Sequence, residues 1–281
     1  MGFIAKRFSF DRVPCEKFGL RIFDIDGNNN EATPFASTGS LQTDVIPSVG
    51  RVYLYGRAYD TPLEFTLVFG LDPCMIDDND YLDRYDMDVI ANWLTDHRTY
   101  KWLEIEQPDM EMVRYHCVIS NLEPIQIAWI PWAFTATVTC DSPYGRKFPK
   151  TFTFDCTESA NAITTITVNN SSTISRLYYP KLHIDKDAAS TTAVGILNQT
   201  VFTTNDGMFK LGSSTDALPA EVVFDVDNEL GIITSPTSGI SNPYKYFNFN
   251  WLPLAKGKNT LKVIGKCTLT FTCEFPVNYG G

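Results

Sequence analysis

The sequence predicts a mainly β protein of two domains, in which an N-terminal β-sandwich-type domain with one α-helix precedes a second β-sandwich. Apolar and polar residues alternate with a period of two along most of the chain, and a single segment has helical spacing instead. The 281 residues correspond to about two domains, at roughly 100 to 200 residues each. The content of 44% hydrophobic and 13% aromatic residues is typical of a folded protein. Each half can therefore bury a core of its own.

The strands are predicted from this alternation, which is clearest at Phe134–Cys140 and Cys267–Phe275. In the second segment, Cys, Leu and Phe side chains face one way, and Thr and Glu side chains face the other. Shorter alternating runs lie between turn-forming Gly, Pro, Asn and Asp residues: Val52–Tyr55, Glu64–Phe69, Val113–Ile119, Glu221–Val226 and Tyr246–Trp251. We therefore expect antiparallel sheets in both halves.

One segment, Asp83–Asp96, predicts an amphipathic helix. Its apolar residues recur at helical spacing: Met87, Ile90, Trp93 and Leu94. Asp83 is a suitable N-cap, and Asp86 and Asp88 follow in the first turns, where negative charge favours the positive end of the helix dipole. A helix that packs on a sheet explains this pattern without any functional role.

The domain boundary is predicted within Asp141–Pro149, which follows a strong strand and contains two prolines and a glycine. We assign residues 1–148 to the first domain and residues 149–281 to the second.

The charge balance makes nucleic acid an unexpected direct partner. The 23 Lys and Arg residues are outnumbered by 33 Asp and Glu residues, so the formal net charge is −10 and phosphate backbones are repelled.

Apolar runs are too short for the roughly 20 residues that cross a bilayer. The first residues lack the apolar core of a signal peptide, and Lys6 replaces the Ser or Thr of a myristoylation signal. We expect no contact with a membrane.

The seven cysteines form no C-x-x-C pair, which excludes a zinc knuckle. Several alternate with polar residues on the predicted strands, where a free thiol behaves as a small apolar side chain. We interpret them as reduced core residues.

The search for catalytic residues begins with the three histidines, His97, His116 and His183, which lie in no recognisable catalytic motif. Glu104 and Glu106 are a sharper candidate, because they lie on one side of a predicted strand about 7 Å apart. Paired carboxylates can hydrolyse glycosides, so these two glutamates are the sole basis for a hydrolase hypothesis. We favour the alternative in which they solvate the exposed face of the strand, and we assign no catalytic residue.

No metal or cofactor is expected. Three acidic turns, Asp24–Glu31, Asp77–Asp80 and Asp225–Glu229, lack the spacing and terminal Glu of an EF-hand loop and are explained by turn chemistry. The glycosylation sequons at Asn169, Asn170 and Asn198 matter only in a secreted eukaryotic protein, so they are set aside.

A family resemblance covers nearly all of residues 1–145. The segments that carry it are Tyr59–Phe69, Ile90–Leu94 within the helix, Tyr100–Ile105, Val113–Leu122 and Pro131–Tyr144. In order and spacing this stretch resembles the siphophage distal tail protein family. The likeness is looser beyond it, where Lys181–Ile184, Val222–Asn228 and Trp251–Val263 are similar to the galectin-like C-terminal β-sandwich of that family.

The resemblance implies a non-enzymatic, structural protein at the distal end of the phage tail, made in the host cytoplasm. It implies a hexameric ring, built by the N-terminal domain, that joins the tail tube to the tip or baseplate and its host-adhesion proteins. The expected partners are further copies of the chain, the major tail tube protein and a tip or fibre protein, with receptor-binding proteins or host glycans as further candidates. The chain has no room for a long insertion in its second domain, so it resembles the compact form of the family.

The alternative function is host-glycan binding by the C-terminal domain. It requires an exposed aromatic platform, such as Trp251 or Tyr246 beside Asn248 and Asn250. Against it, Phe247, Phe249 and Trp251 share one face of a predicted strand, which indicates core. The sugar-binding cluster of galectins has no match that we can place. The pattern leaves open whether Trp129 and Trp132 belong to the core or to an interface.

Overall fold

The computed structural model describes residues 6–25, 40–46, 50–58, 61–72, 81–106, 113–127, 129–157, 163–186 and 191–278. The chain divides into two compact units, Met1–Lys147 together with Val277–Gly281, and Phe148–Pro276. This division differs from the predicted domains at the C-terminal end. Val277 is fully buried in the core of the first unit, and its strand β20 (Pro276–Val277) pairs with β10 (Gly145–Lys147).

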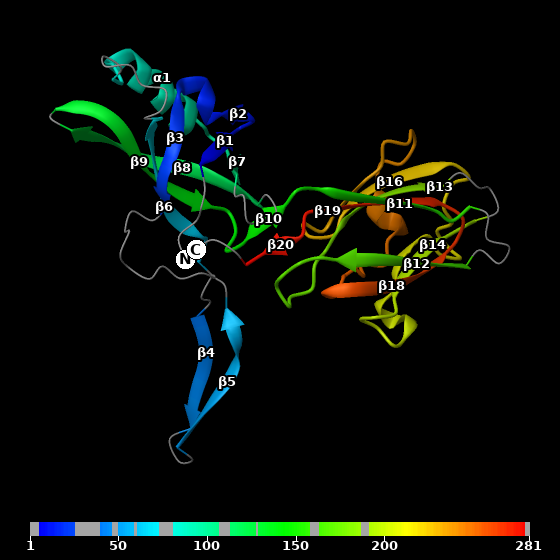
Figure 1. The fold of residues 1–281 in the computed structure, drawn as a ribbon. Helices are drawn as coiled ribbons and strands as arrows, with labels where there is room; N and C mark the ends of the chain where they lie inside the picture. Colours follow the sequence, from blue (N-terminus) through cyan, green and yellow to red (C-terminus); the bar gives the residue numbers. More distant parts are fainter. Residues whose placement is uncertain are drawn as a thin grey trace. The chain divides into compact units, whose positions relative to one another are not determined.

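The first unit is built on a large antiparallel sheet with the strand order β2-β1-β7-β8-β9-β6-β3 (Figure 1). These strands are β1 (Arg7–Phe10), β2 (Val13–Pro14), β3 (Leu20–Ile25), β6 (Glu64–Leu71), β7 (Lys101–Glu106), β8 (Val113–Ile127) and β9 (Ile130–Cys140). The first and last parts of the sheet meet, because the backbone N–H of Ile22 donates to the carbonyl oxygen of Lys6 at 3.1 Å. The facing layers of this sandwich-type unit are therefore parts of one curled sheet.

The core of the first unit lies inside this curled sheet, and helix α1 (Arg84–Thr95) packs onto it. The carboxylate of Asp83 accepts a hydrogen bond from the backbone N–H of Asp86 at 2.7 Å, which confirms the predicted N-cap. Ile90 and Leu94 are buried, and Met87 and Trp93 are partly buried against the same core. A short 3-10 helix, η1 (Cys15–Phe18), follows β2.

The second unit is a β-sandwich, as predicted. One sheet has the order β11-β19-β13-β16-β17 and the other the order β12-β18-β14-β15. The strands of the first sheet are β11 (Lys150–Asp155), β13 (Lys181–Lys186), β16 (Val222–Asp227), β17 (Ile232–Thr234) and β19 (Thr268–Cys273). Those of the second are β12 (Ile163–Asn170), β14 (Val194–Asn198), β15 (Phe209–Leu211) and β18 (Gly257–Ile264). Short 3-10 helices lie at η2 (Asn205–Gly207) and η3 (Pro243–Tyr246). One apolar core fills the space between the sheets.

Buried asparagine side chains hold the irregular segment 251–256 onto this sandwich. The side chain of Asn228 accepts from the backbone N–H of Leu252 at 2.9 Å, and that of Asn198 donates to the carbonyl oxygen of Pro253 at 2.8 Å. Asn170 donates likewise to Leu254, and the amide of Asn259 donates to Ala255 and accepts from it. Asn170 and Asn198, two of the three sequon residues, therefore have structural roles in the interior.

Most predicted strands are confirmed, but the prediction for Tyr246–Trp251 is wrong. Helix η3 ends at Tyr246, and Phe249 has a left-handed backbone with φ of 62°. The amide of Asn248 causes part of this departure, because it accepts from the backbone N–H of Lys210 and donates to the carbonyl oxygen of Met208. A left-handed residue breaks the period-two alternation, so Phe249 is exposed whereas Phe247 is buried.

The six described cysteines, Cys15, Cys117, Cys140, Cys156, Cys267 and Cys273, are free and buried, as predicted. Burial raises the pKa of the Cys267 and Cys273 thiols to about 12. Cys74 lies outside the described residues. Among the residues that the structure describes, no helix is both long and apolar enough to span a membrane.

Candidate functional site

The two glutamates of β7 lie on its outward side, as the favoured interpretation predicts. Leu103 and Ile105 between and beside them are buried. The hydroxyl of Ser9 donates to the Glu104 carboxylate at 3.1 Å, and Glu106 is exposed opposite Arg7. Both carboxylates line a shallow depression of about 220 Å³. Neighbouring strands thus explain both side chains, and the hydrolase hypothesis gains no supporting contact.

Each histidine has a local partner. The Nε2 atom of His97 lies 2.8 Å from the carbonyl oxygen of Trp93, at the end of helix α1. His116 pairs with Asp141 at 2.6 Å, and His183 pairs with Asp225 at 2.7 Å. No cluster of three or more metal-ligating side chains occurs within the described ranges.

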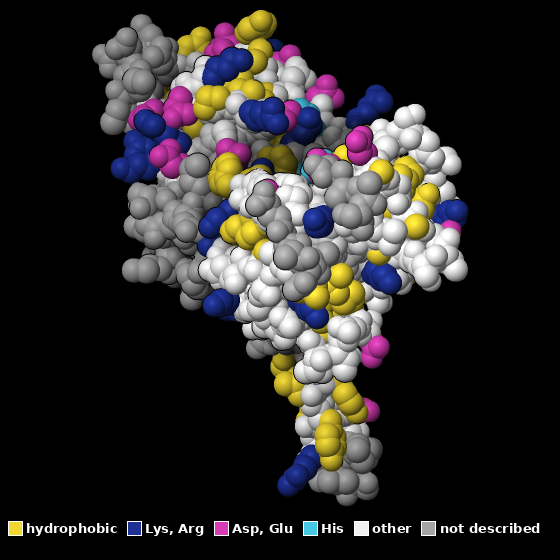
Figure 2. Space-filling view, turned by 90° about the vertical axis from the view of Figure 1, so that its right-hand side faces the viewer, with side chains coloured by type: hydrophobic (Ala, Val, Ile, Leu, Met, Phe, Trp, Pro, Cys, Tyr) yellow, Lys and Arg dark blue, Asp and Glu magenta, His cyan; other side chains and the backbone are white. Residues whose placement is uncertain are grey.

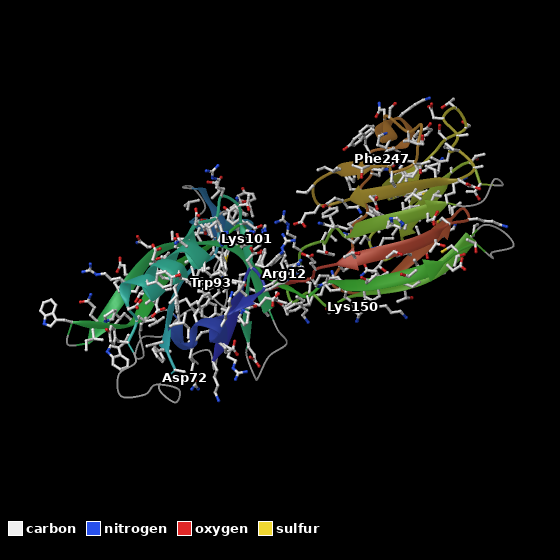
Figure 3. The ribbon with its side chains drawn as sticks, turned by 90° about the horizontal axis from the view of Figure 1, so that it is seen from above. Arg12, Asp72, Trp93, Lys101, Lys150 and Phe247 are labelled. Carbon is white, nitrogen blue, oxygen red and sulfur yellow. The ribbon has the colours of Figure 1, made fainter. Side chains whose placement is uncertain are left out.

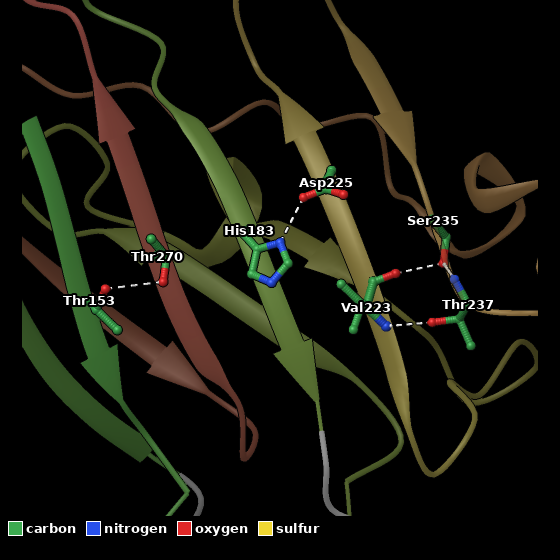
Figure 4. A network of polar contacts seen from close by, with 7 residues as sticks. All are labelled: Thr153, His183, Val223, Asp225, Ser235, Thr237 and Thr270. Atoms are coloured by element: carbon green, nitrogen blue, oxygen red, sulfur yellow. Dashed lines mark hydrogen bonds and ion pairs between the residues drawn. The ribbon is translucent and has the colours of Figure 1, made fainter. Parts of the chain in front are cut away.

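The His183 pair lies on the exposed face of the first sheet of the sandwich (Figure 4). His183 and Asp225 are directly opposite each other on β13 and β16. On neighbouring strands the hydroxyls of Thr153 and Thr270 bond at 3.2 Å, so polar side chains bond to one another across this face. An open depression of about 270 Å³ lies beside the pair. These cross-strand hydrogen bonds are sufficient to explain why His183 and Asp225 occupy this face.

The acidic turn Asp225–Glu229 follows the predicted turn chemistry. The Asp227 carboxylate accepts from the backbone N–H groups of Glu229 and Leu230 at 3.1 and 3.0 Å. The turn Asp77–Asp80, and the part of Asp24–Glu31 that follows Ile25, lie outside the described residues.

The aromatic side chain exposed in the region of the expected glycan platform is Phe249, and not Tyr246 or Trp251. Tyr246 and Trp251 are partly buried against the sandwich core. The amide of Asn250 donates to the carbonyl oxygens of Asp206 and Met208, so it serves to anchor this loop. The exposed ring is that of Phe249, with 63% of its surface accessible, and it stacks on Tyr244 with centroids 6.3 Å apart. Phe247, labelled in Figure 3, is the buried member of this aromatic group.

The β4–β5 hairpin carries an apolar surface that the sequence analysis did not identify. β4 (Ser40–Ile46) and β5 (Arg51–Ala58) form a two-stranded sheet of their own. Residues directly opposite each other share a face, and the pairs are Val45 with Val52 and Thr43 with Leu54. Leu41 belongs to the same face, whereas Gln42, Asp44 and Tyr53 belong to the other.

The apolar face of this hairpin is open to solvent. The accessible fractions are 56% for Leu41, 57% for Val45, 63% for Val52 and 62% for Leu54. Figure 2 shows hydrophobic side chains along the surface of the hairpin, at the bottom of the view. Because an isolated two-stranded hairpin is marginally stable in water, an exposed apolar face on one indicates a surface that a partner covers.

A second exposed apolar feature is the turn between β8 and β9. Trp129 has 92% of its surface exposed and a left-handed backbone with φ of 72°. Trp132, three residues further on, is partly buried. Trp129 is therefore the more exposed member of this pair.

The chain was compared with family models, curated proteins and solved structures. Residues 3–142 match the family model described as the phage tail protein N-terminal domain, and residues 144–273 match that of the phage tail C-terminal domain. Among solved structures, the Dit protein of phage SPP1, a hub protein of the adsorption apparatus, has a TM-score of 0.64 at 11% identity, covering 96% of this chain and 99% of its own. A chain of the phage P2 baseplate has a TM-score of 0.49 at 9% identity, covering 96% and 98% respectively. The search of curated proteins gave no match.

Proposed function

This chain belongs to the phage tail protein family, whose two domain models together match almost its whole length, and we propose that it forms a hexameric ring at the distal end of the tail. In this role the ring joins the tail tube to the tip and its adhesion proteins. Its neighbours are further copies of itself, the tube protein and a tip or fibre protein. The fold likeness to the SPP1 hub protein over 96% of the chain supports this role.

The observation that carries the proposal is the apolar face of the β4–β5 hairpin. Complete burial of one aliphatic side chain contributes roughly 1.5 to 3 kcal/mol. Four such side chains are more than half exposed on this face: Leu41, Val45, Val52 and Leu54. Covering them with a neighbouring copy provides a favourable free energy for assembly.

A cyclic ring suits this kind of surface. In a ring, each copy contacts the next through two different, complementary surfaces, so one copy can contribute the hairpin and its neighbour the surface that receives it. Such an assembly needs no reaction chemistry, in keeping with a structural role.

Light scattering coupled to size exclusion tests the ring directly. Six copies of the 31.6 kDa chain have a mass of about 190 kDa. We expect Leu54→Asp to shift the mass toward 31.6 kDa, because it places a charge in the apolar contact. Gln42→Asp adds the same charge to the opposite face of the hairpin and should leave the ring intact. A wild-type protein that stays monomeric at every concentration, or a Leu54→Asp ring of normal mass, would contradict the proposal.

Glycan binding by the second unit remains the second candidate function. The exposed ring of Phe249, held against Tyr244 by an anchored loop, is the kind of aromatic surface on which a sugar ring can pack. The test is a glycan array with the full chain, followed by titration of any ligand into Phe249→Ala. A uniform background on the array, or unchanged affinity in the variant, would exclude this role.

A further inference from the structure

The turn between β8 and β9 ends a ribbon of two strands that extends beyond its neighbours in the sheet. β7 pairs with β8 only up to Cys117, and β6 pairs with β9 only from Ala133 onward. We call residues 124–127 and 129–131 the tip ribbon. In it Gln126 lies opposite Pro131 and Ile127 opposite Ile130, and neither pair continues onto β7 or β6.

The tip ribbon is unusually apolar for this chain. Between Glu123 and Asp141 the sequence contains no charged residue, although 20% of the chain is charged. Ile125 and Ile130 are 37% and 41% exposed, and Trp129 at the turn is 92% exposed. An exposed apolar segment of this kind indicates burial by another molecule.

Trp129 also holds an unfavourable backbone. Its φ of 72° lies in the left-handed region, which Gly and Asn adopt readily and bulky residues avoid. In an isolated chain a large aromatic residue is unfavourable at this position for two reasons, namely backbone strain and exposed apolar surface. A function that needs the indole at this point explains both costs.

The composition of the ribbon indicates the kind of partner. Pro124 and Pro131 lack the N–H groups that a further strand would need, so addition of a strand at either side is disfavoured. Segments that bind lipid surfaces usually carry Lys or Arg beside their apolar residues, whereas the nearest charged residue along the chain is Glu123. The remaining partner is a protein with an apolar pocket that receives the turn end-on.

A second copy of this chain fits that description poorly. Of the two pockets described in the first unit, the larger, about 410 Å³, is lined by Leu82, whose backbone N–H donates to the carbonyl oxygen of Pro131 at 3.3 Å. The pocket therefore lies beside the base of the chain's own tip ribbon. A ring contact joins different sides of neighbouring copies. Trp129 and this pocket lie on the same side of the unit, so they are not suited to meet in a ring contact.

We propose that Trp129 inserts into an apolar pocket of an unlike tail protein and joins the ring to the component next to it. This inference rests on the proposed function, because it assigns the contact to an axial neighbour of the ring.

Site-specific photocrosslinking in assembled tails tests the inference. Benzoylphenylalanine replaces Trp129 in the full chain, and Tyr85, which is 76% exposed on helix α1, is the control position. After irradiation of purified tails, we expect position 129, and not position 85, to give an adduct with another tail protein, identified by mass spectrometry. An adduct of two copies of this chain, a lipid adduct, or no adduct at position 129 would overturn the inference.

A second variant separates folding from function. Trp129→Asn should fold as well as the wild type and melt at the same or a higher temperature, because Asn tolerates the left-handed backbone. We expect it to form rings of normal mass and to lower the yield of infectious phage at least tenfold. Normal phage yield would refute the role of Trp129. Failure of the wild type to form any ring would instead refute the proposed function, so the two failures are distinguishable.

Discussion

The indole Nε1 of Trp93 donates a hydrogen bond to the backbone carbonyl oxygen of Phe10 at 3.2 Å. This bond joins helix α1 to strand β1, from segments 83 residues apart in the chain. The same indole, labelled in Figure 3, stacks on Phe8 with ring centroids 5.8 Å apart, and its centroid lies 4.7 Å from that of Phe18. The helix is therefore attached to the sheet through one aromatic side chain as well as through its apolar face.

Replacement of Trp93 by Phe should lower the free energy of unfolding by roughly 1 to 2 kcal/mol, because the carbonyl oxygen of Phe10 loses its donor while most ring contacts remain. Chemical denaturation followed by circular dichroism measures the change. Asp88→Ala is the matched control on the same helix, since its exposed contact with Asn92 should contribute little. Equal stability of the Trp93→Phe and wild-type proteins would show that the hydrogen bond is not significant.

The N-cap of helix α1 gives a second prediction. Asp83→Ala should destabilise the first unit by about 1 kcal/mol, because the N–H of Asp86 loses its acceptor. Asp83→Ser keeps an acceptor at the same position and should restore most of the loss. Thermal melts of the three proteins test this order, and a Ser variant as unstable as the Ala variant would contradict it.

The buried amide of Asn259 should be worth more than the helix cap. Asn259→Ala removes the acceptor for the buried side-chain amide of Asn198, and also the acceptor and donor for the partly buried N–H and carbonyl groups of Ala255. We expect a loss of roughly 2 to 4 kcal/mol, at about 1 to 3 kcal/mol for each unsatisfied buried group. Asn169→Ala, an exposed position on β12, should change stability by less than about 0.5 kcal/mol. Similar losses in the two variants would show that the amide contacts are unimportant.

The buried thiols predict loss of stability at alkaline pH. Burial raises the pKa of Cys267 from 9.0 to about 12, so below pH 9 the thiol is protonated in both folded and unfolded chains, and its contribution is complete. As the pH rises toward 12, the unfolded chain loses the proton first and unfolding becomes more favourable, by up to about 1.4 kcal/mol per pH unit for one thiol. Denaturation at pH 8 and pH 10.5 measures the slope. Cys267→Ala should have a shallower slope than the wild type, and identical slopes would contradict the assignment.

Much of the fold is predictable because local pattern and tertiary structure agree. The alternation at Phe134–Cys140 matches the buried and exposed faces of β9, and Asp83 caps the helix that its spacing predicts. Phe249 is an exception, because its exposure depends on a single backbone angle, which the adjacent Asn248 side chain helps to set by bonding to the backbone of a distant segment. Alternation cannot report such an angle.

The surfaces were less predictable for a different reason. The apolar residues of Val52–Tyr55 predict a strand with a buried face, and β5 is a strand, yet Val52 and Leu54 are exposed. A period-two pattern states that a face is apolar, but not whether the same chain covers it. The same reason leaves Trp129 open between core and interface in the sequence, and its exposure shows that it does not belong to the core.

The chain leaves the first unit after Lys147 and returns to it at Val277, through the paired strands β10 and β20. The sandwich is thus a domain inserted into the first unit, and the strands that lead into it and out of it are paired with each other. Exchange of the segment between these strands leaves the remaining strands of the curled sheet in place. Recombination among phages can therefore replace the inserted domain as one block, while the sequence that builds the first unit stays unchanged.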